Sequence, residues 1–199
     1  MINEVKVYSR YHIENFVRNG GLNFPYTNRP WYLISIYSED MDIFLTKYNK
    51  KAIKDMGCKQ ALSLKFWDIT DKQAKEFKSK DLYDNAVLFN IQQAELIIGF
   101  ILSSNQDDES DGVLVIHCDA GISRSGACGT FAVDFLNLDY ESFIKKNNYL
   151  MPNPYILRVL RKTARMTPQF LEKVEKRDIE KVKKDNFLLK EKIDNGELF

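Results

Sequence analysis

The segment 113–126 constrains the fold of this chain more than any other part of its 199 residues. It opens on an apolar run, Val113–Ile116, which predicts a buried strand. It continues as His-Cys-Asp-Ala-Gly-Ile-Ser-Arg-Ser-Gly over 117–126, and a helix-forming stretch covers Arg124–Leu138. The segment therefore predicts a strand, a tight loop and a helix in immediate succession.

The loop of this segment has the features of an anion-binding site. Five residues separate Cys118 from Arg124, which is the length of loop needed to wrap a tetrahedral oxyanion with backbone N–H groups. The N-terminus of the following helix adds free donors and a partial positive charge, and such a field favours the thiolate form of a cysteine. The phosphate-binding residues that we expect are Asp119, Ala120, Gly121, Ile122, Ser123 and Arg124.

Individual side chains of the loop have distinct expected roles. Cys118 is the expected nucleophile, and Gly121 allows a crowded backbone conformation in which N–H groups can converge. Arg124 offers a planar fork that can clamp two phosphate oxygens. Ser125 can place a hydroxyl near the sulfur to assist its departure as a leaving group. The Asp119 side chain should face away from the phosphate, and we assign it no catalytic role.

The pattern His-Cys-x5-Arg-Ser between a strand and a helix resembles the signature of the protein tyrosine phosphatase superfamily. The Ala-Gly-Ile-Ser-Arg-Ser wording is most similar to its compact, dual-specificity-like members. The resemblance implies the cysteine phosphatase fold, a central and mainly parallel sheet flanked by helices. It also implies a reaction without metal or cofactor, in which Cys118 attacks phosphorus, Arg124 holds the oxygens and water frees the phosphocysteine.

The second catalytic group should be a carboxylic acid, because the leaving oxygen must be protonated. In the superfamily, this acid is an aspartate on a loop that follows the strand beside the nucleophile strand. Asp68 is our first choice, since it follows Trp67 at the end of a predicted strand, although the Trp-Pro-Asp of the tyrosine-specific enzymes is absent. Asp71 and Asp84 remain alternatives.

The resemblance implies hydrolysis of phosphotyrosine and of phosphoserine or phosphothreonine in protein substrates. An RNA 5′-phosphatase would use the same chemistry, and a phosphoprotein-binding module of weak activity is a rival of another class. Residues 119–123 contain no lysine, which argues against multiply charged phosphoinositide substrates. A sulfurtransferase would not need the pair Arg124 and Ser125.

Helices and strands alternate along the rest of the chain, which indicates an α/β fold with a parallel sheet covered on both faces. Further strands are predicted over Trp31–Tyr37 and Gln60–Trp67, and a loop over Ser103–Gly112. Predicted helices cover Ser9–Asn19, Ile43–Lys54, Thr70–Lys80, Asn90–Leu102 and Tyr155–Arg165. Ser9 and Asn153 are expected N-caps, and Gly20 and Gly21 a helix stop.

Composition excludes several classes of protein. The formal net charge of +1 does not favour general binding to nucleic acid or membranes. Cys58, Cys118 and Cys128 have no paired spacing, which argues against a disulfide scaffold or a metal site. We expect Cys128 to be a core residue and Cys58 to be buried or a resolving thiol. No apolar run approaches a membrane span and no secretory pattern opens the chain, so we expect a cytoplasmic location.

The end of the chain differs from the rest. From Pro168 it is dense in Lys and Glu, with a narrow apolar stripe that indicates one charged helix. We therefore expect a phosphatase domain over 1–166 and a helical extension over 167–199. A helix of this kind gains little by folding alone, so it should dock on the domain or associate with a partner or a second copy. The stripe consists of Phe170, Val174, Ile179, Val182, Leu189 and Ile193.

Overall fold

The computed structural model describes residues 1–38, 47–70, 72–73, 75–76, 88–106 and 111–194. The chain divides into two compact units, Met1–Ala164 and Arg165–Phe199. The first unit carries the sheet and the second carries one long helix.

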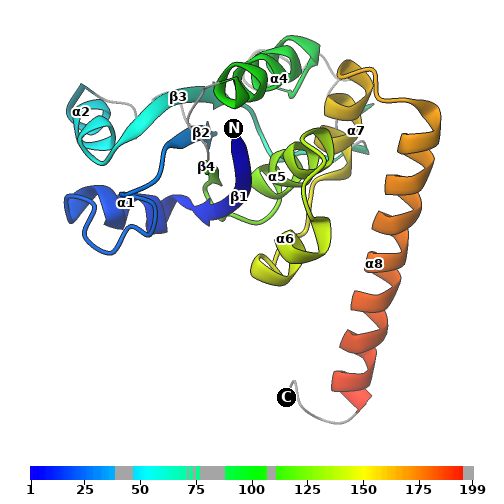
Figure 1. The fold of residues 1–199 in the computed structure, drawn as a ribbon. Helices are drawn as coiled ribbons and strands as arrows, with labels where there is room; N and C mark the ends of the chain where they lie inside the picture. Colours follow the sequence, from blue (N-terminus) through cyan, green and yellow to red (C-terminus); the bar gives the residue numbers. More distant parts are fainter. Residues whose placement is uncertain (39–46, 71, 74, 77–87, 107–110, 195–199) are drawn as a thin grey trace. The chain divides into compact units, whose positions relative to one another are not determined.

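The described strands form a four-stranded parallel sheet in the order β1-β4-β2-β3 (Figure 1). The strands are β1 (Ile2–Ser9), β2 (Trp31–Tyr37), β3 (Cys58–Lys65) and β4 (Gly112–Cys118). The predicted α/β class with a parallel sheet is thus confirmed.

Strand β4 lies inside the sheet, with β1 on one side and β2 on the other. Leu114 pairs with Val5 of β1 and with Tyr32 of β2. Every residue of β4 is buried, as the apolar run of the sequence predicts. The strand that leads into the loop is therefore fixed from both edges and both faces.

Strand β1 was not among the predicted elements. It has buried residues at Ile2, Val5 and Val7, but its register against β4 shifts between Ile2 and Glu4. This irregularity breaks the strict alternation that marks a half-buried strand. The alternating pattern Val5-Lys6-Val7 is too short to predict a strand by itself.

Most predicted helices are present, with the predicted N-caps Ser9 and Asn153 and a further N-cap at Asn90. Ser9 Oγ accepts from the N–H of His12, and Asn90 forms a capping box with Gln93. Asn153 Oδ1 accepts from the N–H groups of Tyr155 and Ile156. The described helices of the first unit are α1 (Arg10–Arg18), α2 (Lys47–Asp55), α4 (Ile91–Asn105), α5 (Arg124–Phe135), α6 (Tyr140–Lys146) and α7 (Pro154–Thr163).

The structure corrects several boundaries. Helix α4 continues to Asn105 and β4 begins at Gly112, so the predicted loop 103–112 is shorter than expected. Helix α6 was not predicted; it is short and polar, and the Asp139 side chain caps it by accepting from the N–H of Ser142. Residues 72–73 and 75–76 are helical, while the rest of 71–80 and all of 43–46 lie outside the described residues.

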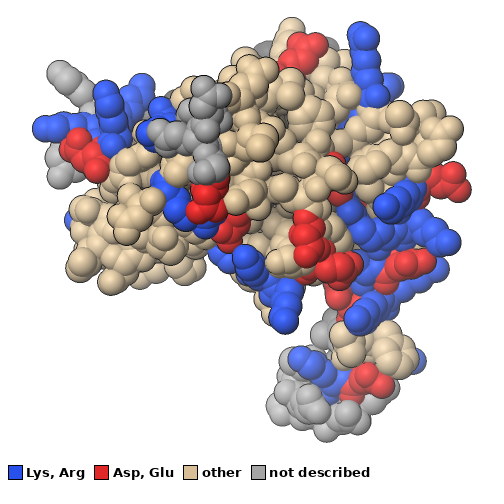
Figure 2. All heavy atoms as spheres, viewed as in Figure 1, with Lys and Arg blue, Asp and Glu red and all other residues tan. Residues whose placement is uncertain are grey.

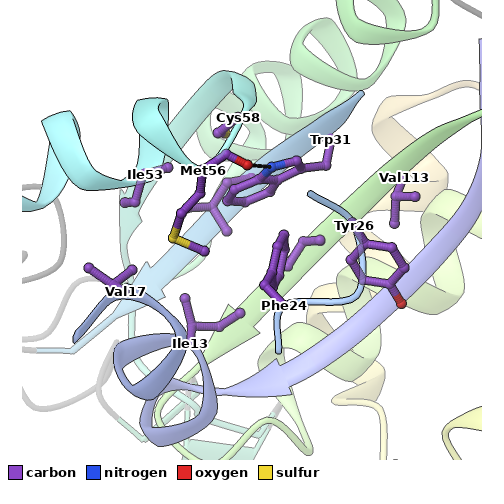
Figure 3. Close-up of a cluster of buried hydrophobic side chains, with 11 residues drawn as sticks. Ile13, Val17, Phe24, Tyr26, Trp31, Ile53, Met56, Cys58 and Val113 are labelled. Carbon is purple, nitrogen blue, oxygen red and sulfur yellow. Dashed lines mark hydrogen bonds between the residues drawn. The ribbon is translucent and has the colours of Figure 1, made fainter. Parts of the chain in front are cut away.

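Helices cover both faces of the sheet. Helices α1 and α2 contact each other on the face that presents Trp31, Leu33 and Val115, where a buried apolar cluster forms (Figure 3). In this cluster the Trp31 indole N–H donates to the carbonyl of Met56 at 3.0 Å. Helix α5 packs against β1 and β4 on the opposite face.

Helix α5 lies unusually close to the sheet. A Cβ built at Gly129 would lie 2.9 Å from Val7 Cγ2 and 3.1 Å from Phe143. Only a residue without a side chain allows this approach. The middle of α5 is therefore held close to β1 and α6.

The second unit contains α8 (Pro168–Asp194), the predicted charged helix. Charged side chains of both signs lie along it (Figure 2), and Lys181 pairs with Asp185. Its exposed apolar side chains include Ile179 and Val182 of the predicted stripe, whereas the side chains of Leu189 and Ile193 lie outside the description. Among the described helices, none combines the length and apolar character needed to cross a membrane.

Candidate active site

Cys118 is the last residue of β4 and Arg124 the first of α5, so the loop between them spans the gap from sheet to helix. The thiol of Cys118 is buried within this loop. Its Sγ lies 3.0 Å from Ser125 Oγ, and the N–H of Gly121 donates to it at 3.3 Å. Two polar groups thus hold the sulfur at one point, and Ser125 is where its expected role requires it.

Three carbonyl groups of the loop are held from outside it. The N–H of Arg10 donates to Asp119 O at 3.2 Å, that of Met151 to Ile122 O at 3.3 Å and that of Asn153 to Ser123 O at 3.2 Å. The C=O and N–H of a trans peptide point in opposite directions. The N–H groups that follow these carbonyls therefore face the interior of the loop.

The N-terminus of α5 is left open for an anion. Ser123 is its N-cap residue, but no side-chain hydrogen bond caps the helix. The Ser123 hydroxyl donates instead to Asp68 Oδ1 at 2.8 Å. The N–H groups of the first turn and the positive end of the helix dipole remain free to stabilise negative charge.

Gly121 is required by the close approach of the loop to the junction of β1 and α1. Its φ is +74°, and a Cβ built there would lie 2.4 Å from Ser9 N and 2.6 Å from Tyr8 O. Both contacts are to backbone atoms, which cannot move away cheaply. The conformational role predicted for Gly121 has this packing as its cause.

The Arg124 side chain is buried and held by three groups. Its Nη1 donates to Ser38 Oγ at 2.7 Å and to Phe66 O at 2.9 Å, and its Nη2 donates to Asp119 Oδ2. Its buried Nε has no hydrogen-bond partner among the described residues. The Nε of Arg124 therefore remains available as a donor for the expected contact with phosphate.

The Asp119 carboxylate contacts Arg124, which the sequence did not predict. The side chain is 41% exposed and also lies 3.6 Å from Arg10 Nη1. Burial by itself would raise the pKa of Asp119. The hydrogen bond and charge of Arg124, with contributions from Ser38 and Arg10, outweigh burial and hold this pKa below its ordinary value.

Asp68 lies at the edge of the loop, just after β3. Its Oδ1 accepts from Ser123 Oγ and, at 2.7 Å, from Asn153 Nδ2. The neighbouring Trp67 donates its indole N–H to Ser38 O at 3.2 Å, which ties this segment to the end of β2. Asp71 and Asp84, the alternative acids, lie outside the described residues.

Two residues of this site, Ser38 and Asn153, were not predicted as site residues from the sequence. Ser38 follows β2, and the carboxyl ends of neighbouring parallel strands meet at one edge, which was a usable signal. Asn153 was recognised as an N-cap, but its Nδ2 also donates to Asp68 and, at 3.0 Å, to Ile69 O. One amide thus joins the start of α7 to the segment that carries Asp68.

The other two cysteines are not part of the loop. Cys128 lies in α5 and is fully buried, and burial raises the pKa of its thiol. Burial also raises the pKa of Cys58 to about 12. All three cysteines are free thiols. Within the described part of the chain, no group of three or more His, Cys, Asp or Glu side chains could hold a metal ion.

No protein-family profile and no curated protein sequence matches the chain. Several solved structures match the chain. The crystal structure of PTPMT1 in complex with PI(5)P has a TM-score of 0.50 and 17% identity, covering 86% of this chain and 95% of that one. The chain has the protein tyrosine phosphatase fold. The structure of Tk-PTP in the active form has a TM-score of 0.47 and 14% identity, covering 82% of this chain and 91% of that one.

Proposed function

We propose that this protein is a cysteine-dependent phosphatase that hydrolyses phosphomonoesters, with phosphotyrosine and phosphoserine or phosphothreonine in proteins as substrates. The observation that carries the proposal is the buried Sγ of Cys118 inside a loop, three of whose carbonyls accept hydrogen bonds from residues outside the loop. The protein tyrosine phosphatase fold supports it, because this fold places a loop of this kind between strand and helix.

In the first step, the Cys118 thiolate attacks phosphorus and the bond to the leaving oxygen breaks. The inward N–H groups and the Nε of Arg124 stabilise the charge on the three other oxygens. A protonated Asp68 gives its proton to the leaving oxygen, which departs as an alcohol or phenol. Both contacts to Asp68 use Oδ1, so Oδ2 can carry this proton.

In the second step, water attacks the phosphorus of phosphocysteine. Asp68, now a carboxylate, takes a proton from this water, and the sulfur leaves as a thiolate. The Ser125 hydroxyl, 3.0 Å from the sulfur, donates to it as its charge develops. Inorganic phosphate is released and Asp68 is again protonated.

Protein substrates are favoured by the absence of lysine from residues 119–123 and by the acidic Asp119 at the loop. Phosphoinositides form the second candidate class, because the structural neighbour PTPMT1 was crystallised with PI(5)P. A 5′-phosphorylated RNA would be hydrolysed by the same chemistry. A phosphoprotein-binding module would bind the phosphoryl group without turnover.

The test compares wild-type protein with Cys118→Ser. Wild-type protein should release phosphate from an aryl phosphate in the presence of a chelator, because no step uses a metal. Cys118→Ser should abolish release but still bind a phosphotyrosine peptide, since the anion contacts come from the backbone and Arg124. Turnover by the Cys118→Ser protein would eliminate the cysteine mechanism.

Substrate class is tested by phosphate release from a matched panel. It contains phosphotyrosine, phosphoserine and phosphothreonine peptides, PI(5)P in mixed micelles and 5′-triphosphate RNA. We expect the highest kcat/KM with the peptides. Faster release from PI(5)P or RNA would replace the substrate assignment, whereas tight peptide binding without turnover would favour the binding module.

A further inference from the structure

Asp119 lies between two cationic side chains, Arg10 and Arg124. Its Oδ2 accepts from Arg124 Nη2 and, at 3.1 Å, from Ser38 Oγ. Its Oδ1 lies 3.6 Å from Arg10 Nη1. Both oxygens of the carboxylate therefore face a cationic side chain.

These contacts fix which edge of the Arg124 guanidinium is occupied. Ser38 Oγ contacts Nη1 at 2.7 Å and also contacts the Asp119 oxygen that accepts from Nη2. Ser38 and Asp119 thus bridge the terminal edge, which is formed by the two Nη atoms. The other fork of the guanidinium, formed by Nε and Nη2, keeps its buried Nε without a partner among the described residues.

The charge of Asp119 is maintained by the same contacts. Its pKa lies below the ordinary value because Arg124, Ser38 and Arg10 outweigh the effect of burial. The Asp119 carboxylate is therefore ionised at neutral pH. A permanent anion at this point can hold a cation but cannot act as a proton donor.

We infer that Asp119, together with Ser38, is a positioning residue that holds Arg124 by its terminal edge and keeps the Nε edge turned toward the substrate oxyanion. This inference rests on the proposed function of the same loop. Asp119 itself does not touch the substrate in this arrangement. It acts through the orientation of Arg124, whose Nη1 is also held by Phe66 O at 2.9 Å.

The contact between Asp119 and Arg124 also allows an opposing interpretation, which an experiment can distinguish. If the Asp119 carboxylate instead competed with the substrate for Arg124, removing its charge would tighten anion binding. If it positions Arg124, removing the charge loosens the guanidinium and weakens anion binding. The two interpretations predict changes of opposite sign.

The experiment titrates the full chain with inorganic tungstate, a tetrahedral oxyanion, by calorimetry, so that binding is read without turnover. Asp119→Asn and Asp119→Ser should raise the Kd for tungstate about tenfold, as expected for loss of one charge-assisted contact. With an aryl phosphate, KM should rise more than kcat falls. Thermal unfolding of each variant checks that the fold is intact.

The matched control is Glu14→Gln. Glu14 accepts from Arg10 Nε at 2.9 Å but does not contact Arg124, so this variant removes one carboxylate from the neighbourhood without touching the clamp. Its Kd for tungstate should change less than twofold. A tenfold rise in this control would mean that general electrostatics, rather than contact with Arg124, causes the effect.

A double-mutant cycle shows whether Asp119 and Ser38 act as a unit. Ser38→Ala should raise the Kd in the same direction, and the double variant should lose less than the sum of the two single losses. Unchanged or tighter tungstate binding in both Asp119 variants would overturn this inference while leaving the phosphatase proposal intact. Wild-type protein that neither binds tungstate nor releases phosphate would overturn both.

Discussion

Asp68, the proposed general acid, is held in place by side chains from two other segments of the chain. Its Oδ1 takes one hydrogen bond from the loop, through Ser123, and one from the start of α7, through Asn153. These two contacts fix the carboxyl group beside the loop without occupying Oδ2. The aspartate is therefore placed by neighbours that are not themselves reactive.

The first prediction concerns the leaving group. Asp68→Asn should lower kcat for a phosphoserine peptide about 100-fold or more, because an alkoxide leaves slowly without a proton. The kcat for an aryl phosphate whose leaving group is an acidic phenol should fall much less.

The control for this prediction applies the same change to the alternative acids. Asp71→Asn and Asp84→Asn should remain close to wild type with both substrates. Selective loss with phosphoserine in one of these variants, and not in Asp68→Asn, would move the acid to that position. The cysteine mechanism would be unaffected by this outcome.

At this scale, the sequence predicted the residues of the continuous motif better than their surroundings. Cys118, Ser125 and Gly121 lie where their spacing places them. The contact between Asp119 and Arg124 depends on side-chain rotamers and on Ser38, which comes from another strand end. No local pattern encodes such a contact.

Among the elements, the loop and the junction of β1 and α1 form one packed unit. The second prediction is that Gly121→Ala lowers phosphatase activity about 100-fold, because a Cβ 2.4 Å from Ser9 N must displace the loop or the junction. The measurement is kcat/KM with an aryl phosphate. The free energy of unfolding should fall as well.

Gly99→Ala in α4 is the matched control. A Cβ at Gly99 has no neighbour within 4 Å, so alanine should raise the free energy of unfolding by about 0.5–1 kcal/mol. Activity should not change. Equal effects of the two substitutions would contradict the steric explanation.

The third prediction concerns Glu4 of β1, which pairs with Arg29 at 2.7 Å and with Lys146 at 3.2 Å. Burial raises the pKa of Glu4, but these two partners outweigh it and lower the pKa below 4.5. A carboxyl group whose pKa is lowered by folding stabilises the protein above its unfolded-state pKa. The contribution is lost as the pH falls through the folded-state pKa.

Glu4→Gln should therefore lower the free energy of unfolding by up to about 1 kcal/mol at neutral pH. The difference from wild type should be smaller in acid than at neutral pH. Urea unfolding at both pH values measures it. A difference for Glu4→Gln that stays constant with pH would refute the ion-pair origin.

Elements with clear boundaries in the sequence were predicted, and those without them were not. The predicted strand Trp31–Tyr37 matches β2 at both ends, and the Asn90 cap marks the start of α4. Strand β1 was missed because its register shift against β4 disturbs the alternation. Helix α6 was missed because seven mostly polar residues carry little periodic signal.

At the scale of the molecule, the described catalytic candidates all belong to the unit Met1–Ala164. The fourth prediction is that a chain ending at Met166 turns over an aryl phosphate within a few-fold of the full chain. Circular dichroism should show that the shortened chain is folded. A folded but inactive protein would make α8 part of the active site.

The strand order has a consequence for the synthesis of this chain. Of the four described strands, β1 is synthesised first and its partner β4 is synthesised last. Strands β2 and β3 can pair early, but β4 must enter between β2 and β1 before the sheet is complete. A nascent chain whose synthesis has not yet reached Gly112 therefore exposes the unpaired edges of β1 and β2 and the apolar faces of these strands. Such an intermediate is prone to aggregation, and the loop over 119–123 is among the last parts of the sheet unit to form.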